Sequence, residues 1–243
     1  AALRGHQVTI FEKSLQIGGQ LLIASVPPRK EEMMRSINYY CNVLPELDVT
    51  FRLGQEFSEK DYASFDEVIV ATGATNAIIP VPGKDLPTVV SAWDVLAKKE
   101  IVFGKVSVIG GGLVGVETAE YLASRGCKVT IVEMMDQIAK EESNTVLPTL
   151  MKELNSHEVE VLTSAKLMEI TENAVIVEKT VDEKTEKAEV ASDFVVMAVG
   201  AKKNVVELNN CTLPIHYVGD CAGERPSNID HAIKSAYDVA CEL

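Results

Sequence analysis

The sequence predicts an α/β fold in which helices pack on central parallel sheets, and three observations support this class. A β-branched segment at residues 106–109 leads directly into a glycine-rich turn and a helix. Part of the same pattern is repeated at the start of the chain. Apolar segments of strand length alternate with helical segments over the 243 residues, which is typical of parallel sheets joined by crossover helices.

The turn after residues 106–109 places Gly110, Gly112 and Gly115 in the spacing G-x-G-x-x-G. The first glycine allows a sharp turn, the second allows a pyrophosphate to approach the backbone, and the third allows the helix to pack against the strand. The helix expected at residues 113–124 points its free N–H groups at the same phosphates. The segment therefore predicts a dinucleotide-binding turn, and the alternative is a glycine-rich turn without a ligand.

The strand expected at residues 128–132 ends on Glu133. An acid at this distance from the turn accepts hydrogen bonds from the hydroxyls of an adenosine ribose. Because a carboxylate repels a 2′-phosphate, Glu133 favours NAD(H) over NADP(H).

The beginning of the chain repeats part of this unit, because residues 4–12 match residues 125–133 almost position by position at an offset of 121. We therefore expect the end of a helix at residues 1–4, a strand at residues 8–11 and a second ribose acid at Glu12. The same offset places the partner glycine turn about eleven residues before Ala1. Residues 70–74 also resemble residues 197–201. Two related units predict two dinucleotides, as a flavin enzyme reduced by a nicotinamide requires.

The remaining elements follow from hydrophobic periodicity and turn residues. Prolines and a glycine between residues 80 and 87 mark the best candidate for a border between the two units. A charged hairpin tip is expected at residues 182–187. We expect helices at residues 29–44, 144–155 and 228–242, a loop at residues 18–21, and strands at residues 49–53, 66–72, 158–162, 166–170, 174–179, 194–199 and 215–218.

The composition excludes several classes of protein. The net charge of −13 opposes binding to nucleic acid and to anionic membrane surfaces. The sequence shows no apolar stretch that could cross a bilayer and no secretory signal pattern, so we expect a cytoplasmic protein. The five cysteines form no C-x-x-C pair and have no metal-ligand spacing, which indicates reduced thiols and no metal site.

The order of these motifs resembles the flavoproteins that carry two dinucleotide-binding domains. Within that group the chain is most similar to the C-terminal half of 2,4-dienoyl-CoA reductase and related NADH:flavin oxidoreductases, which include trimethylamine dehydrogenase. The resemblance covers essentially the whole chain. It implies two Rossmann-like domains in three layers: an FAD domain formed by residues 1–86 and 205–243, in which the first βα turn is missing, and an inserted NAD(P)H domain at residues 87–204.

The resemblance also implies which residues bind each cofactor. The helix that starts near Asn228 would point its N-terminus at the flavin, and His231 beside it is a candidate for a functional role. No catalytic side chain is expected, because the hydride passes directly between the two cofactors. The resemblance assigns Glu12, Lys13, Gly19, Gln20, Leu21, Ala71, Thr72, Gly73, Gly219 and Asp220 to FAD, and Gly110, Gly112, Leu113, Val114, Gly115, Glu133 and Gly200 to the nicotinamide nucleotide.

The function implied is hydride transfer from NADH to FAD, followed by electron relay to an FMN or iron–sulfur centre. That centre would lie in an N-terminal FMN-binding barrel domain that this sequence lacks, so the chain would be an incomplete enzyme. An oligomer is compatible with the sequence. One alternative is a structural nucleotide-binding domain that holds ADP or no ligand. Another is a disulfide reductase, which would need two cysteines brought together by folding.

Overall fold

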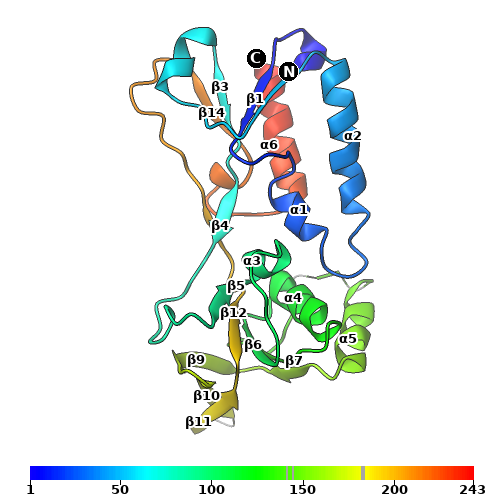
Figure 1. The fold of residues 1–243 in the computed structure, drawn as a ribbon, viewed down its shortest axis with the longest axis vertical. Helices are drawn as coiled ribbons and strands as arrows, with labels where there is room; N and C mark the ends of the chain where they lie inside the picture. Colours follow the sequence, from blue (N-terminus) through cyan, green and yellow to red (C-terminus); the bar gives the residue numbers. More distant parts are fainter. Residues whose placement is uncertain (141, 144, 182–183) are drawn as a thin grey trace. The chain divides into compact units, whose positions relative to one another are not determined.

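The protein is described here by a computed structural model of residues 1–140, 142–143, 145–181 and 184–243 (Figure 1). Its backbone contacts divide it into two compact units. Unit 1 comprises Ala1–Leu22, Glu32–Thr75 and Ala201–Leu243, and unit 2 comprises Ile23–Glu31 and Asn76–Gly200. The main crossings between the units lie somewhat earlier in the chain than the borders that the resemblance implies.

Unit 2 is built on a parallel sheet of five strands. The strand order is β5 (Val89–Ser91), β12 (Phe194–Met197), β6 (Lys105–Ile109), β7 (Lys128–Val132) and β8 (Glu160–Leu162). The central strand β6 pairs with β7 on one side and with β12 on the other. Its residues 106–109 are buried, as expected for a parallel strand that is covered on both faces.

The two faces of this sheet are covered by different layers (Figure 1). One face packs against α3 (Ala92–Leu96), α4 (Leu113–Ala123) and α5 (Leu147–Ser156) in a single apolar cluster. The other face packs against an antiparallel sheet of β9 (Ala165–Ile170), β10 (Ala174–Val181) and β11 (Lys184–Ala191). The three layers are therefore helices, parallel sheet and antiparallel sheet.

Unit 1 contains two separate pairs of parallel strands. Strand β1 (Thr9–Glu12) pairs with β2 (Thr50–Leu53), and β3 (Val68–Val70) pairs with β14 (Ile215–Tyr217). Its helices are the first part of α1 (Gln20–Ala24), α2 (Met33–Glu46) and α6 (Ile229–Glu242), with short 3-10 turns at Ala2–Arg4, Glu59–Ser64 and Gly219–Cys221. Among the described residues of α6 none is buried, and in α2 only Ile37 is. On α6 the large apolar residues Ile229, Ile233 and Tyr237 are exposed, whereas most apolar residues of α2 are at least partly buried.

The chain passes between the units at a short pair of strands, β4 (Ala74–Asn76) and β13 (Ala201–Lys203). Helix α1 also crosses the border, because its first three residues belong to unit 1 and its last two to unit 2.

Several elements differ from the sequence-based expectation. Helix α2 begins at Met33 rather than near residue 29, because Arg29 has a left-handed backbone with φ of 67° that no helix can include. Residues 20–24 form a helix where we expected a loop, and β5 and α3 were not predicted. Of the expected hairpin tip, residues 184–187 belong to β11, while residues 182–183 lie outside the described part, as does Asn144.

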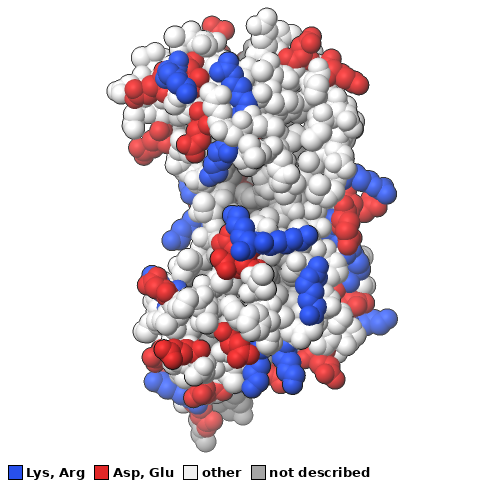
Figure 2. Space-filling view, in the orientation of Figure 1, with Lys and Arg blue, Asp and Glu red and all other residues white. Residues whose placement is uncertain are grey.

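Charged side chains of both signs are interspersed on the face shown in Figure 2, which displays no continuous basic patch. Within the described ranges, none of the helices has the length and apolarity needed to cross a membrane.

Candidate functional site

The turn after β6 has a geometry that requires glycine at two of its positions. Gly110 has a φ of 105°, and a Cβ atom there would collide with the backbone oxygen of Ala198. A Cβ atom on Gly115 would collide with the backbone oxygen of Gly110. The first turn of α4 therefore packs directly on the ends of β6 and β12, and no larger residue fits there.

Gly112 differs from the other two glycines. Its φ is −68°, and a Cβ atom on it would meet nothing within 4 Å. It is exposed and forms the N-cap of α4, followed by the exposed residues Leu113 and Val114. Among the described residues, no acceptor takes the amide groups of Leu113, Val114 or Gly115. Open space, free N–H donors and the positive end of a helix together fit a phosphate group.

Glu133 braces this turn. Its carboxylate accepts a hydrogen bond from the amide of Gly111 at 2.6 Å and another from the amide of Met135 at 2.7 Å. The side chain is nearly buried, at the carboxyl end of β7. Each carboxylate oxygen can accept a further hydrogen bond, so the group can also receive ribose hydroxyls. Sequence reasoning predicted the ribose contact but missed the bracing of Gly111.

Glu12 occupies the same place in unit 1 as Glu133 does in unit 2. It is the last residue of β1, and its carboxylate accepts the amide of Ser14 at 2.8 Å, two residues onward as in Glu133. The helix caps agree as well. Gly5 and Gly126 have φ values of 94° and 89°, and each donates its amide to the residue three positions back at 2.9 Å. The repeat read from the sequence is therefore also a repeat of backbone geometry.

In unit 1 the structure brings together three residues that are far apart in the sequence. The side-chain amide of Gln20 donates to Asp220 Oδ2 at 3.2 Å, and Asp220 Oδ1 accepts the amide of Ser227 at 2.9 Å. A Cβ atom on Gly73 would lie 2.7 Å from Gln20 Nε2. Gln20, Gly73 and Asp220 thus lie close together.

A second set of hydrogen bonds joins Thr72 and Gly73 to Asn204. The Thr72 hydroxyl donates to the Asn204 carbonyl, and the Asn204 side chain donates back to the Thr72 carbonyl at 3.1 Å. The Asn204 amide also donates to the Gly73 carbonyl at 2.9 Å. These bonds fix the backbone at residues 72–73.

The other expected FAD residues are placed as follows. Asn228 caps α6, because its side chain accepts the amide of His231 at 2.9 Å. The Gly219 amide donates to the Ser235 hydroxyl at 2.8 Å. Four further FAD candidates take no part in these hydrogen bonds, namely the exposed Lys13, Gly19 and Ala71, and Leu21 in α1. Gly200, which was expected at the nicotinamide nucleotide, is exposed at the end of unit 2.

Two acids on α4 were not predicted from the sequence. Glu117 and Glu120 lie in a helix that is otherwise apolar, and both are nearly buried. Glu120 pairs with Arg29, and Glu117 pairs with Lys30. Burial raises the pKa of Glu117, although Lys30 acts in the opposite direction, and the hydrogen bond with Glu120 raises the pKa of Arg29. The sequence signal that could have indicated these ion pairs is the presence of two acids three positions apart in an otherwise apolar helix.

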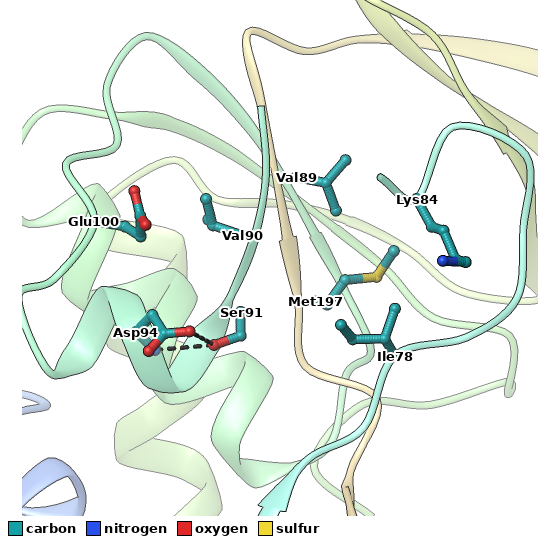
Figure 3. A pocket seen from close by; sticks show the side chains of 8 residues that line it. All are labelled: Ile78, Lys84, Val89, Val90, Ser91, Asp94, Glu100 and Met197. Atoms are coloured by element: carbon teal, nitrogen blue, oxygen red, sulfur yellow. Dashed lines mark hydrogen bonds between the residues drawn. The ribbon is translucent and has the colours of Figure 1, made fainter. Parts of the chain in front are cut away.

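A cavity of about 200 Å³ lies elsewhere in unit 2 (Figure 3). None of the expected cofactor-binding residues lines it. Its polar groups are partly used in capping α3, because the Ser91 hydroxyl lies 2.7 Å from Asp94 Oδ2 and accepts the Asp94 amide at 3.0 Å. We therefore assign no cofactor to it. Its lining consists of Ile78, Lys84, Val89, Val90, Ser91, Asp94, Glu100 and Met197.

In the part of the chain that the structure describes, no group of three or more His, Cys, Asp or Glu side chains could hold a metal ion. All five cysteines are free thiols, so no disulfide is formed.

The chain is similar to a known family and to several reductases and oxidases. The family model described as pyridine nucleotide-disulphide oxidoreductase matches residues 36–236. The chain is 45% identical over 245 residues to a bilirubin reductase of Mediterraneibacter gnavus, covering 99% of this chain and 37% of the relative. It is 34% identical over 254 residues to an NADH oxidase of Thermoanaerobacter brockii, covering 100% of this chain and 38% of the relative. A solved structure of a 2-naphthoyl-CoA reductase complex superimposes with a TM-score of 0.92 at 26% identity, over 100% of this chain and 37% of that one.

Proposed function

Because the chain belongs to the pyridine nucleotide-disulphide oxidoreductase family, we propose that it is the electron-input module of a longer enzyme, in which NADH reduces FAD. The α/β fold, the family resemblance and the class of flavin-dependent NAD(P)H oxidoreductase are confirmed by the family match and by the relatives. The chain spans less than two fifths of the length of those relatives. The substrate and the partner domains of the whole protein are therefore part of the proposal.

The observation that carries the proposal is the open turn at the start of α4. Gly112 leaves the backbone accessible, the first amides of α4 are free, and Glu133 stands at the end of the neighbouring strand. This arrangement fits the pyrophosphate and ribose of a dinucleotide. We assign the nicotinamide nucleotide to Gly110, Gly112, Leu113, Val114, Gly115, Glu133 and Gly200.

We assign FAD to unit 1. We propose the domain borders expected above, with the FAD domain at residues 1–86 and 205–243 and the NAD(P)H domain at residues 87–204. The Gln20, Gly73 and Asp220 cluster, the capped start of α6 and Glu12 support this assignment. Lys13, Gly19, Leu21, Ala71, Thr72 and Gly219 complete the proposed set. The bound cofactors supply the hydride transfer itself, and the chain holds and orients them.

Unit 1 has no counterpart of β6 among its described strands. In unit 2, β6 lies between β7 and β12, whereas in unit 1 no described strand lies between the equivalent strands β1 and β3. The strand pairs on either side agree in register between the two units. In the pair β1–β2 Thr9 faces Thr50, and in the equivalent pair β7–β8 Thr130 faces Glu160. In the pair β3–β14 Val68 faces Ile215, and in the equivalent pair β12–β5 Val195 faces Val89. We propose that a strand, glycine turn and helix preceding Ala1 fill this place and supply the missing half of the FAD site.

The apolar face of α6 supports the same proposal. Ile233 and Tyr237 are 59% and 67% exposed on a helix that has no buried residue among those described. Arg4, in the last turn of the expected helix, lies close enough to Tyr237 for its charge to act on it. A helix running into Ala2–Arg4 would therefore reach this face and cover it.

We further propose that electrons leave FAD for an FMN or iron–sulfur centre in an N-terminal domain. The short share of each relative that the chain covers supports a further domain of this kind. We also propose a cytoplasmic location, which the free thiols of all five cysteines fit.

The rival function is a structural domain that holds ADP or nothing in place of FAD. An absorbance spectrum of the purified full-length protein separates the two. We expect the band of oxidised flavin, released as FAD on denaturation, in about one equivalent per chain. A full-length protein that folds and binds NADH without any flavin band would favour the structural domain.

Glu133 also allows a test of cofactor choice. We expect Glu133→Arg to lower the ratio of NADH affinity to NADPH affinity about tenfold or more, because an acceptor for ribose hydroxyls is replaced by a partner for the 2′-phosphate. The ratio of the two affinities is measured by fluorescence titration. Loss of the Gly111 hydrogen bond lowers the affinity for both cofactors alike, so it does not change this ratio. Glu133→Gln is the matched control, because it can still accept an amide without attracting phosphate. An unchanged ratio in Glu133→Arg would contradict the placement of this acid.

A further inference from the structure

Residues Ile23–Glu31 pack as part of unit 2, although the chain on both sides of them belongs to unit 1. We call this segment the strap. Ser25 and Pro27 are buried, and Ile23 and Val26 pack against the apolar cluster that contains α4. The strap is therefore docked on unit 2 and is not a free surface loop.

The strap brings two cations to the side of α4. The guanidinium of Arg29 donates to both oxygens of Glu120, at 2.6 Å from Nη1 and 2.8 Å from Nη2. Lys30 pairs with Glu117. The Glu120 side chain is 2% exposed and the Arg29 side chain is 46% exposed, so a buried carboxylate receives two hydrogen bonds from a cation that is partly in water.

The position of these acids gives the strap a role beyond stability. Glu117 and Glu120 lie in the helix whose N-terminus we propose to bind a pyrophosphate. At 1.5 Å of rise per residue they lie about 6 Å and 10 Å along the axis from Leu113. Two carboxylates at these distances in a poorly hydrated setting would repel a bound pyrophosphate unless they were neutralised. Arg29 and Lys30 provide this neutralisation, and Glu153 and Glu31 add weaker attraction to Arg29.

We propose that the strap is an electrostatic latch for the nucleotide site. When Arg29 and Lys30 are docked on α4, the glycine turn binds the pyrophosphate of a dinucleotide more tightly, and a bound dinucleotide in turn holds the strap in its docked position. This inference rests on the proposed function, because it requires a pyrophosphate at the turn.

The first test compares charge variants by calorimetric titration of the whole chain with ADP-ribose, which carries the pyrophosphate without the nicotinamide. We expect R29Q/K30Q to bind about tenfold more weakly than wild type, because it leaves two acids unneutralised. The matched control R29Q/K30Q/E117Q/E120Q lacks all four charges. We expect it to regain most of the lost affinity, to within about threefold of wild type.

These variants separate the latch from a purely structural role. If the ion pairs only stabilise the fold, the folded fraction of R29Q/K30Q, checked by circular dichroism, binds ADP-ribose as tightly as wild type does, and that result would overturn the latch. Because removing only the cations strands two buried acids and can unfold the protein, K30Q alone is measured as well. We expect it to bind about threefold more weakly than wild type, while E117Q/K30Q regains wild-type affinity.

A second test uses wild-type protein alone. Trypsin cleaves after Arg29 and Lys30, but only when the strap undocks. Because coupling between two equilibria is reciprocal, saturating ADP-ribose should slow this cleavage about tenfold. Cleavage after Lys187, on the exposed strand β11, should be unaffected. Equal cleavage of the strap with and without ADP-ribose would overturn the latch, whereas wild-type protein that binds no ADP-ribose would contradict the proposed function itself.

Discussion

A chain extended upstream of Ala1 by the natural strand, glycine turn and helix is expected to bind FAD at least about 100-fold more tightly than residues 1–243 alone. The turn would add several charge-assisted hydrogen bonds to the FAD phosphates, each of which contributes about 1.5–3 kcal/mol. The helix would add the positive end of its dipole. The dissociation constants are measured by flavin fluorescence titration of both proteins.

The same extension should also stabilise unit 1. It would pair the edges of β1 and β3 that no described strand pairs, and it would cover Ile233 and Tyr237 on α6. We expect the free energy of unfolding to rise by about 3 kcal/mol or more, measured by urea denaturation. A control extension of equal length made of glycine and serine should change neither quantity. Equal FAD affinity in the natural and control extensions would contradict the proposed place of this segment.

The second large effect concerns the nicotinamide site. We expect Gly112→Ala to weaken NADH binding about 30-fold or more while leaving the free energy of unfolding within about 0.5 kcal/mol of wild type. The alanine methyl group meets no protein atom within 4 Å, and the backbone φ of −68° suits any residue. The methyl group would therefore obstruct only a ligand that approaches the backbone.

Gly115→Ala is the matched comparison, since its methyl group would collide with the Gly110 carbonyl. We expect it to lower the free energy of unfolding by about 2–4 kcal/mol, as judged by urea denaturation, and to weaken NADH binding as a consequence. If Gly112→Ala binds NADH as wild type does, the pyrophosphate is not at this turn.

Much of unit 2 could be predicted because local signals and tertiary structure agree there. The strand, the glycine turn, the helix and Glu133 form one contiguous pattern, and the collisions at Gly110 and Gly115 explain why the glycines are required. The repeat at residues 4–12 also predicted the place of Glu12, since the same spacing produces the same strand and cap.

Other features could not be predicted because they depend on contacts between distant parts of the chain. Helix α1 is held by the bond between Gln20 and Asp220, two hundred positions apart. Arg29 has a positive φ and donates its guanidinium to Glu120, which lies far along the chain, and neither feature has a local sequence signal. Strand β11 carries a charged sequence typical of a turn, and it forms because it pairs with β10 along its length.

The central claim is that this chain holds NADH and FAD so that a hydride passes from NADH to FAD. Its most direct test is an anaerobic titration of the FAD-loaded, full-length protein with NADH, followed by absorbance. The account predicts that about one equivalent of NADH bleaches the oxidised flavin band, and that Gly112→Ala slows this bleaching. A flavin band that persists while NADH is shown to bind would contradict it.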